Sequence, residues 1–141
     1  SFILLIWVIV LTIASDVGGY VFGKLFKWKR LTKISPKKTI SGVLGSFIFS
    51  LCSVFLLGFI IEFVSGLDSE TFQKPRYFIL AIIFSLTAQI GDLVISYLKR
   101  LEKIKDTGKF LPGHGGIFDR IDGLIFVVIV AYISYSLKLF P

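Results

Sequence analysis

Charged and polar residues gather where the apolar stretches of this 141-residue sequence end. Asp92 lies near the end of one such stretch, where an ionised carboxylate is costly and usually faces a partner or a water-filled cavity. Ser96, Lys99 and Arg100 follow at i+4, i+7 and i+8, so a helix would place all four side chains on one face. Pairing with a lysine could explain Asp92 alone, but a functional carboxylate is the better interpretation.

A glycine-rich segment, 105–116, follows. Its glycines permit backbone angles that other residues avoid, so successive N–H groups can converge on an anion. A plain turn would also use glycine, but the surrounding Lys and Arg suit phosphate oxygens. The candidate phosphate-binding residues of this segment are Lys105, His114, Gly115 and Gly116.

Two carboxylates, Asp119 and Asp122, stand three residues apart at the start of the last apolar stretch. Asp is a good helix N-cap and suits a first helical turn, which could explain both residues. The same spacing also lets two carboxylates point at one cation. Mg²⁺ prefers one or two carboxylates together with phosphate oxygens. Arg120, between them, is a candidate phosphate ligand.

A second basic segment, 35–39, precedes another apolar stretch. Its Pro36 disfavours helical backbone at the preceding residue, so a helix is expected to begin after it. A helix N-terminus at the membrane surface is a natural place for phosphate, although an ordinary basic flank of a membrane helix is an equally good interpretation. The candidate phosphate-binding residues are Ser35, Lys37, Lys38 and Thr39.

Apolar stretches must position these residues. The chain is 55% hydrophobic and 18% charged, and roughly 20 apolar residues span a bilayer. We therefore predict an all-α, polytopic transmembrane helical bundle with about four transmembrane helices, forming a single membrane-embedded domain over 1–141. The absence of Met predicts the C-terminal portion of a longer chain. The expected stretches are Phe2–Ala14, Val43–Val64, Tyr77–Leu98 and Gly123–Leu137.

The basic residues predict the topology. Residues 15–42 carry seven Lys and Arg against one acid, and residues 99–122 carry six against four, whereas 65–76 is balanced. The positive-inside bias places both basic segments in the cytoplasm, with the site on the cytoplasmic side of the inner or plasma membrane. Asp16 faces the same side and could join the site. The net charge of +7 favours anionic ligands or lipid head groups over nucleic acid as binding partners.

Carboxylates for a divalent metal and basic groups for phosphates thus converge on one membrane face. This combination of groups is typical of sites for phosphoryl or nucleotidyl transfer, where substrate positioning and charge neutralisation account for most of the catalysis. One Cys and one His exclude an internal disulfide and a multi-histidine metal site.

The chain also resembles the phosphatidate cytidylyltransferase (CDP-diacylglycerol synthase) family. The family signature reads S-x-x-K-R-x-x-x-x-K-D-x-G-x-x-x-P-x-H-G-G-x-x-D-R-x-D, and residues 96–122 meet all its fixed positions. The resemblance extends to Gly91-Asp92-Leu93 and to the segments 35–39 and 16–23, and so covers essentially the whole chain. The chain departs from many relatives at two positions. It has Ile95 and Ser41 where those relatives carry Glu.

The resemblance implies transfer of CMP from CTP to phosphatidic acid, giving CDP-diacylglycerol and pyrophosphate in phospholipid biosynthesis. It implies Mg²⁺ as the cofactor. We expect CTP, phosphatidic acid and the lipid bilayer as partners and no nucleic acid, and the sequence leaves a second cation and a homodimer open. Asp92 and Asp119 are the first metal ligands it implies, followed by Asp122 and Asp106. Phosphates would be held by Ser96, Lys99, Arg100, Lys105, Arg120, the 112–116 loop, Lys37 and Lys38.

Three rival interpretations are weighed against this one. A related transferase acting on an isoprenoid lipid, of the CDP-archaeol synthase or polyprenol kinase type, would share the topology. A non-catalytic membrane scaffold or transporter would not need glycine-rich phosphate segments beside paired acids. A CDP-alcohol phosphotransferase would carry a D-G-x-x-A-R motif, which the sequence lacks.

Overall fold

A computed structural model describes residues 2–27, 29–30, 38–66, 70, 74–101 and 118–139, with residues 118–122 described by their backbone alone. Within these residues the chain forms helices and no strand, apart from an isolated bridge between Arg30 and Thr39. The predicted all-α class is therefore confirmed. The four helices are α1 (Phe2–Phe26), α2 (Ile40–Ser65), α3 (Pro75–Leu101) and α4 (Phe118–Ser136).

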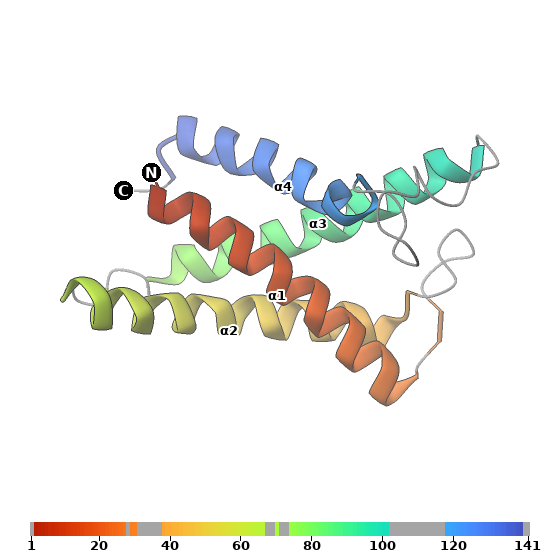
Figure 1. Cartoon of the computed structure of the whole chain (residues 1–141), viewed down its shortest axis with the longest axis horizontal. Coiled ribbons are helices and arrows are strands. Elements are labelled where there is room, and N and C mark those ends of the chain that lie inside the picture. Colours follow the sequence, from red (N-terminus) through yellow and green to blue (C-terminus); the bar gives the residue numbers. More distant parts are fainter. Residues whose placement is uncertain are drawn as a thin grey trace.

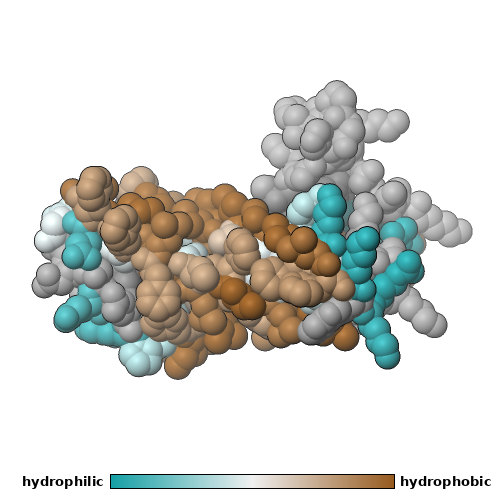
Figure 2. Space-filling model, turned by 90° about the horizontal axis from the view of Figure 1, so that it is seen from below, coloured by the Kyte–Doolittle hydropathy of each residue, from teal (hydrophilic) through white to brown (hydrophobic). Residues whose placement is uncertain are grey.

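The helices alternate in direction, so the ends of α1 and α3 and the starts of α2 and α4 point to the same end of the bundle (Figure 1). α1 packs mainly on α2, and α4 mainly on α3. Three helices, α1, α2 and α3, are long and apolar enough to cross a membrane, whereas the apolar part of α4 is shorter, Gly123–Ser136. An apolar band with hydrophilic residues at both ends is visible in Figure 2. The chain is a membrane protein.

The ends of α2 and α3 lie within a few residues of the predicted ones, and local capping residues explain where they fall. The Thr39 side chain caps α2 by accepting a hydrogen bond of 3.2 Å from the N–H of Gly42. The helix ends at Gly66, whose φ of 63° is favourable for glycine, and the N–H of Gly66 donates to Glu62 O at 3.0 Å. α3 begins on Pro75, where a missing N–H costs nothing.

The predicted end of the first helix was wrong. Residues 15–26, assigned to a cytoplasmic loop, continue α1 to Phe26. Asp16 and the glycines that follow it lower the local hydropathy, but those glycines let α1 approach α2 closely. A Cβ on Gly18 would collide with Gly45 O, and one on Gly45 would collide with Gly18 O. Packing against α2 thus outweighs the poor helix propensity of glycine.

The buried core changes character along the bundle. Near the N-terminus of α1, Trp7 packs edge-on against Tyr77 with ring centroids 5.7 Å apart, and against Phe84 at 5.8 Å. Further along, the buried groups become small and polar: Ser15 and Ser85 share a hydrogen bond of 2.8 Å between their hydroxyls. Small side chains leave space beyond them, and the polar pocket described next lies in that direction.

Candidate functional site

A polar pocket of about 240 Å³ lies between α1, α2 and α3. Acidic, basic, amide and hydroxyl groups share it, which makes it the place where the predicted chemistry could occur. The described residues that line it are Asp16, Gly19, Tyr20, Lys38, Thr39, Gly42, Val43, Ser46, Gln89 and Asp92.

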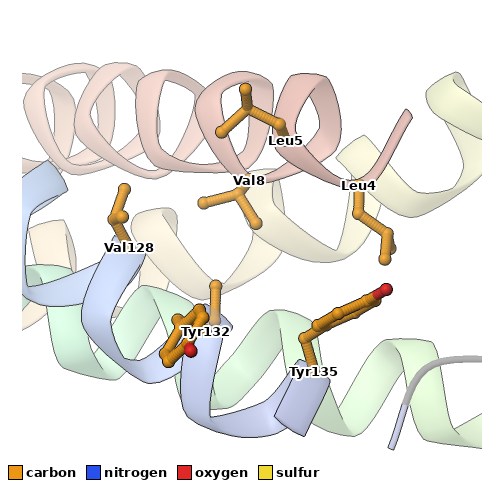
Figure 3. A pocket seen from close by; sticks show the side chains of 7 residues that line it. Leu4, Leu5, Val8, Val128, Tyr132 and Tyr135 are labelled. Carbon is orange, nitrogen blue, oxygen red and sulfur yellow. The ribbon is translucent and has the colours of Figure 1, made fainter. Parts of the chain in front are cut away.

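A second pocket, of about 220 Å³, lies between α1 and α4. Leu4, Leu5 and Val8 line it from α1, and Val128, Tyr132 and Tyr135 line it from α4 (Figure 3). The described residues that line this pocket include no charged group. Metal and phosphate sites need charged or polar groups, which the described lining of the polar pocket offers, so the polar pocket is the candidate site.

The central contact of the polar pocket is an ion pair. Lys38 Nζ lies 3.4 Å from Asp92 Oδ2, and the two side chains are 25% and 27% exposed. Lys38 Nζ also donates a hydrogen bond of 3.2 Å to the backbone carbonyl of Gln89, one turn before Asp92. α3 thus offers Lys38 both a carboxylate and a carbonyl, while the partial exposure leaves both groups reachable by a ligand.

Local backbone structure places Lys38 at the pocket. Thr39 is bridged to Arg30, and the N–H of Ile40 donates to Lys29 O at 3.1 Å. These bonds tie the start of α2 to the residues that follow α1. Lys38 therefore has little freedom of backbone position, and its side chain reaches across to α3 instead of into solvent.

α4 closes against the other side of Asp92. A Cβ built on Gly123 would lie 2.7 Å from Asp92 Oδ1 and 3.2 Å from the carbonyl of Ala88. Only a glycine allows α4 to come this close to the carboxylate. Asp119 lies four residues earlier on the same helix, one turn toward its start.

This close approach gives a first prediction. Gly123→Ala is expected to keep the bundle folded, because Ala favours helix, but to push the Asp92 carboxylate away from its position. We expect kcat to fall by roughly 10- to 100-fold, since a displacement of about 1 Å can cost 10²-fold. Steady-state turnover and far-UV circular dichroism of the variant measure both effects. If the variant turned over as fast as the wild type, the close approach of Gly123 would not be what positions Asp92.

The structure brings together some of the predicted site residues. Lys38, Thr39 and Asp92 line the pocket, and Asp16, which the sequence suggested only weakly, joins them. Ser96, Lys99 and Arg100 continue along α3 toward its end at Leu101, outside the residues that line the pocket. Asp92 lies roughly 14 Å from that end of the helix, deeper than the sequence predicted.

Other predicted site residues are placed only in part. The first turn of α4 contains Asp119, Arg120 and Asp122, by backbone position. The predicted positions outside the described residues are Ser35, Lys37, Lys105, Asp106, His114, Gly115 and Gly116. Their roles stay predictions.

The sequence did not single out Gln89, Tyr20 or Ser46, which all line the pocket. One signal was available for Gln89, because it stands three residues before Asp92 on a helix and therefore shares its face. Its side-chain amide donates to the Ser85 hydroxyl at 3.4 Å, which links the pocket to the buried Ser15–Ser85 pair. Tyr20 and Ser46 had no such signal, since each depends on how α1 and α2 pack.

Ser41, one of the two departures from many relatives, is buried and its hydroxyl bonds that of Thr39 at 3.0 Å. It is not among the described residues that line the pocket. The hydroxyl of Ser41 therefore supports the start of α2.

Comparisons with known proteins show the family to which the chain belongs. A model of the cytidylyltransferase family matches residues 1–138. Three similar proteins are named phosphatidate cytidylyltransferase. The one from Helicobacter pylori strain J99 is 39% identical over 86% of this chain, the one from Rickettsia conorii 37% over 84%, and the one from Staphylococcus haemolyticus 41% over 81%.

The chain spans 43%, 51% and 42% of the length of these three relatives, about half of each. The family model nevertheless covers nearly every residue of the chain, including all four helices and the polar pocket. The chain therefore belongs to the cytidylyltransferase family.

Proposed function

We propose that this chain carries the active site of a phosphatidate cytidylyltransferase, which transfers CMP from CTP to phosphatidic acid and releases pyrophosphate. The observation that supports this most is the ion pair between Lys38 and Asp92 in a polar pocket among apolar helices. A scaffold would gain little from a partly exposed carboxylate and ammonium at this depth, because their desolvation is costly. Similar proteins named for this activity support the same assignment.

In the proposed reaction a phosphate oxygen of phosphatidic acid attacks the α-phosphorus of CTP. A new P–O bond forms there as the bond to the pyrophosphate oxygen breaks. The attacking phosphate is already an anion at neutral pH, so the site needs no general base. It must instead neutralise and align two polyanions, which is the main task in transfers of this kind.

The described residues fit a magnesium ion, which the family resemblance implies. Asp16 and Asp92 offer hard carboxylate oxygens from two helices. No group of three or more His, Cys, Asp and Glu forms within the described part of the chain. Such a sparse set suits Mg²⁺, which keeps several waters and takes further oxygens from substrate phosphates. When bound, Mg²⁺ would supply positive charge that stabilises negative charge developing on the phosphates.

The basic groups of the site would bind and orient the phosphates. Lys38 offers a point charge at the pocket, next to the N-terminus of α2, whose dipole favours an anion. Lys99 and Arg100 follow on the last turn of α3. This distribution would let one phosphate sit in the pocket and others extend toward the end of the bundle.

We propose a multi-pass topology with the site facing the cytoplasm. The direction of the helices supports it, because α1 and α3 end at the same end of the bundle (Figure 1), and their last turns carry Lys24 and Lys99 with Arg100. The excess basic charge then faces anionic lipid and nucleotide phosphates instead of nucleic acid. A homodimer stays a prediction.

The proposal is tested with the purified full-length protein in detergent, given α-labelled CTP, Mg²⁺ and one lipid at a time. Two lipids with the same phosphate head group are compared: phosphatidic acid, which has acyl chains, and an analogue that has isoprenoid chains. Mg²⁺-dependent label in the lipid phase with phosphatidic acid supports the proposal. Label only with the isoprenoid lipid would move the assignment to an isoprenoid-lipid transferase, and no label with either would contradict catalysis.

A further inference from the structure

Lys38 contacts one oxygen of the carboxylate that is proposed to bind a metal ion. Its ammonium lies 3.4 Å from Asp92 Oδ2, while a metal ion bound there would place a second positive charge within a few ångströms. Both charges cannot share the carboxylate at low cost in a partly buried pocket. A metal at Asp92 would therefore favour movement of Lys38 away from the carboxylate.

We propose that Lys38 is an exchangeable counter-ion: it neutralises Asp92 in the empty site and turns to a substrate phosphate when a divalent metal takes the carboxylate. This inference deepens the proposed function and rests on its assignment of metal and phosphate to this pocket. Besides its predicted contact with phosphate, Lys38 would then make the binding of the metal depend on the presence of a phosphate ligand.

The contacts of Lys38 favour such an exchange. Its second partner is the backbone carbonyl of Gln89, a neutral acceptor that can retain the ammonium in the pocket once Asp92 is taken. Thr39 and the N-terminus of α2 lie beside it, where a cation is unfavourable and an anion favourable. A phosphate arriving there would give Lys38 a new charged partner within the same pocket.

A thermodynamic consequence follows. A free divalent ion would displace Lys38 from Asp92 without giving it a new charged partner, so this ion should bind weakly. A metal that arrives with a polyphosphate gives Lys38 a replacement partner, so the two ligands strengthen each other's binding, and by linkage the coupling is reciprocal. The site would then admit metal and nucleotide together and would discriminate against free metal.

The test is a titration with Mn²⁺, a spectroscopic substitute for Mg²⁺, on the full-length protein, followed by electron paramagnetic resonance. The proteins compared are the wild type, Lys38→Met, Lys38→Arg and Lys29→Met. The last changes an exposed lysine near α2 and matches the loss of charge. Each protein is titrated with Mn²⁺ under three conditions: without a second ligand, with CTP, and with inorganic pyrophosphate. No lipid is added.

For Mn²⁺ alone we expect Lys38→Met to bind about tenfold more tightly than the wild type, with Lys38→Arg and Lys29→Met near the wild type. We expect pyrophosphate to tighten Mn²⁺ binding to the wild type by about 5- to 150-fold, the usual range of coupling between two ligands. In Lys38→Met this enhancement should shrink at least severalfold. A merely structural lysine would instead weaken Mn²⁺ binding in both conditions.

Unchanged or weaker binding of Mn²⁺ alone by Lys38→Met would overturn the proposal, as would an equal pyrophosphate enhancement in Lys38→Met and the wild type. CTP separates this inference from the proposed function. If pyrophosphate shows the expected pattern but CTP does not bind, the counter-ion stands and the assignment of CTP as substrate fails.

Discussion

Asp92→Asn is expected to lower kcat for CMP transfer by about 10²- to 10³-fold, the usual cost of losing one group that stabilises transition-state charge. Asparagine keeps the volume of the side chain and an oxygen that can accept from Lys38. The bundle should therefore fold, while the carboxylate charge proposed to bind the metal is lost. Initial rates with labelled CTP, together with thermal unfolding in detergent, measure the two consequences separately.

Glu62→Gln provides the matched control for Asp92→Asn, because it makes the same chemical change at an exposed position near the far end of α2. Its rate should equal that of the wild type. A loss of less than about fivefold in Asp92→Asn, with the fold intact, would mean that the Asp92 charge contributes little to the reaction. The proposed metal ligand would then have to be sought among the first residues of α4.

Gly18→Ala is expected to destabilise the protein by about 3 kcal/mol, the upper end of the usual range for overpacking. The new Cβ would collide with the carbonyl of Gly45 and lie 2.7 Å from the Cβ of Phe49. A backbone carbonyl cannot rotate away as a flexible side chain can, so α1 and α2 must separate. Since Asp16 and Gly19 line the pocket from α1, activity should fall as well. Unfolding in denaturant, with the rate assay, measures these effects.

Gly23→Ala serves as the comparison for Gly18→Ala, because both change a glycine of α1 that faces α2. A Cβ on Gly23 would lie 3.2 Å from Thr39 Oγ1, and its next contact is at 3.8 Å. The higher helix propensity of Ala, about 1 kcal/mol, offsets this mild crowding, so stability should change little. Equal losses in the two variants would show that the close approach at Gly18 and Gly45 is not what holds α1 on α2.

Hydropathy was sufficient to predict α2 and α3, whose apolar stretches are long and almost uncharged. It failed for the second half of α1, because Asp16 and three glycines resemble the start of a loop. Whether such a segment is helical depends on what it packs against. The partner surface, around Gly42 and Gly45, is equally weak as a local signal, and only the two surfaces together explain the helix.

The site was predictable as a set of residue types but not as a set of contacts. Lys38 was one of several basic residues predicted to bind phosphate, and nothing in the local sequence selects Asp92 as its partner. That choice depends on the bridge between Arg30 and Thr39 and on how α2 crosses α3. The contact of Gly123 with Asp92 likewise depends on the approach of α4, which the spacing of residues along the chain does not encode.

The central claim, that metal and nucleotide phosphates bind at the Asp92 pocket, can be tested by locating the metal. Cys52, the one cysteine of the chain, is exposed on α2, six residues after the pocket residue Ser46. A nitroxide attached there, with any cysteine outside these 141 residues replaced, should lie on the order of 20 Å from the pocket, given the rise of about 1.5 Å per residue and the length of the label.

The measurement is the relaxation enhancement of this nitroxide by Mn²⁺ in the presence of CTP, in the wild type and in Asp92→Asn. We predict strong enhancement in the wild type, corresponding to a distance on the order of 20 Å, and its loss in Asp92→Asn at the same Mn²⁺ concentration. Equal enhancement in both proteins, or none in a wild type that binds Mn²⁺, would contradict the claim and place the metal elsewhere.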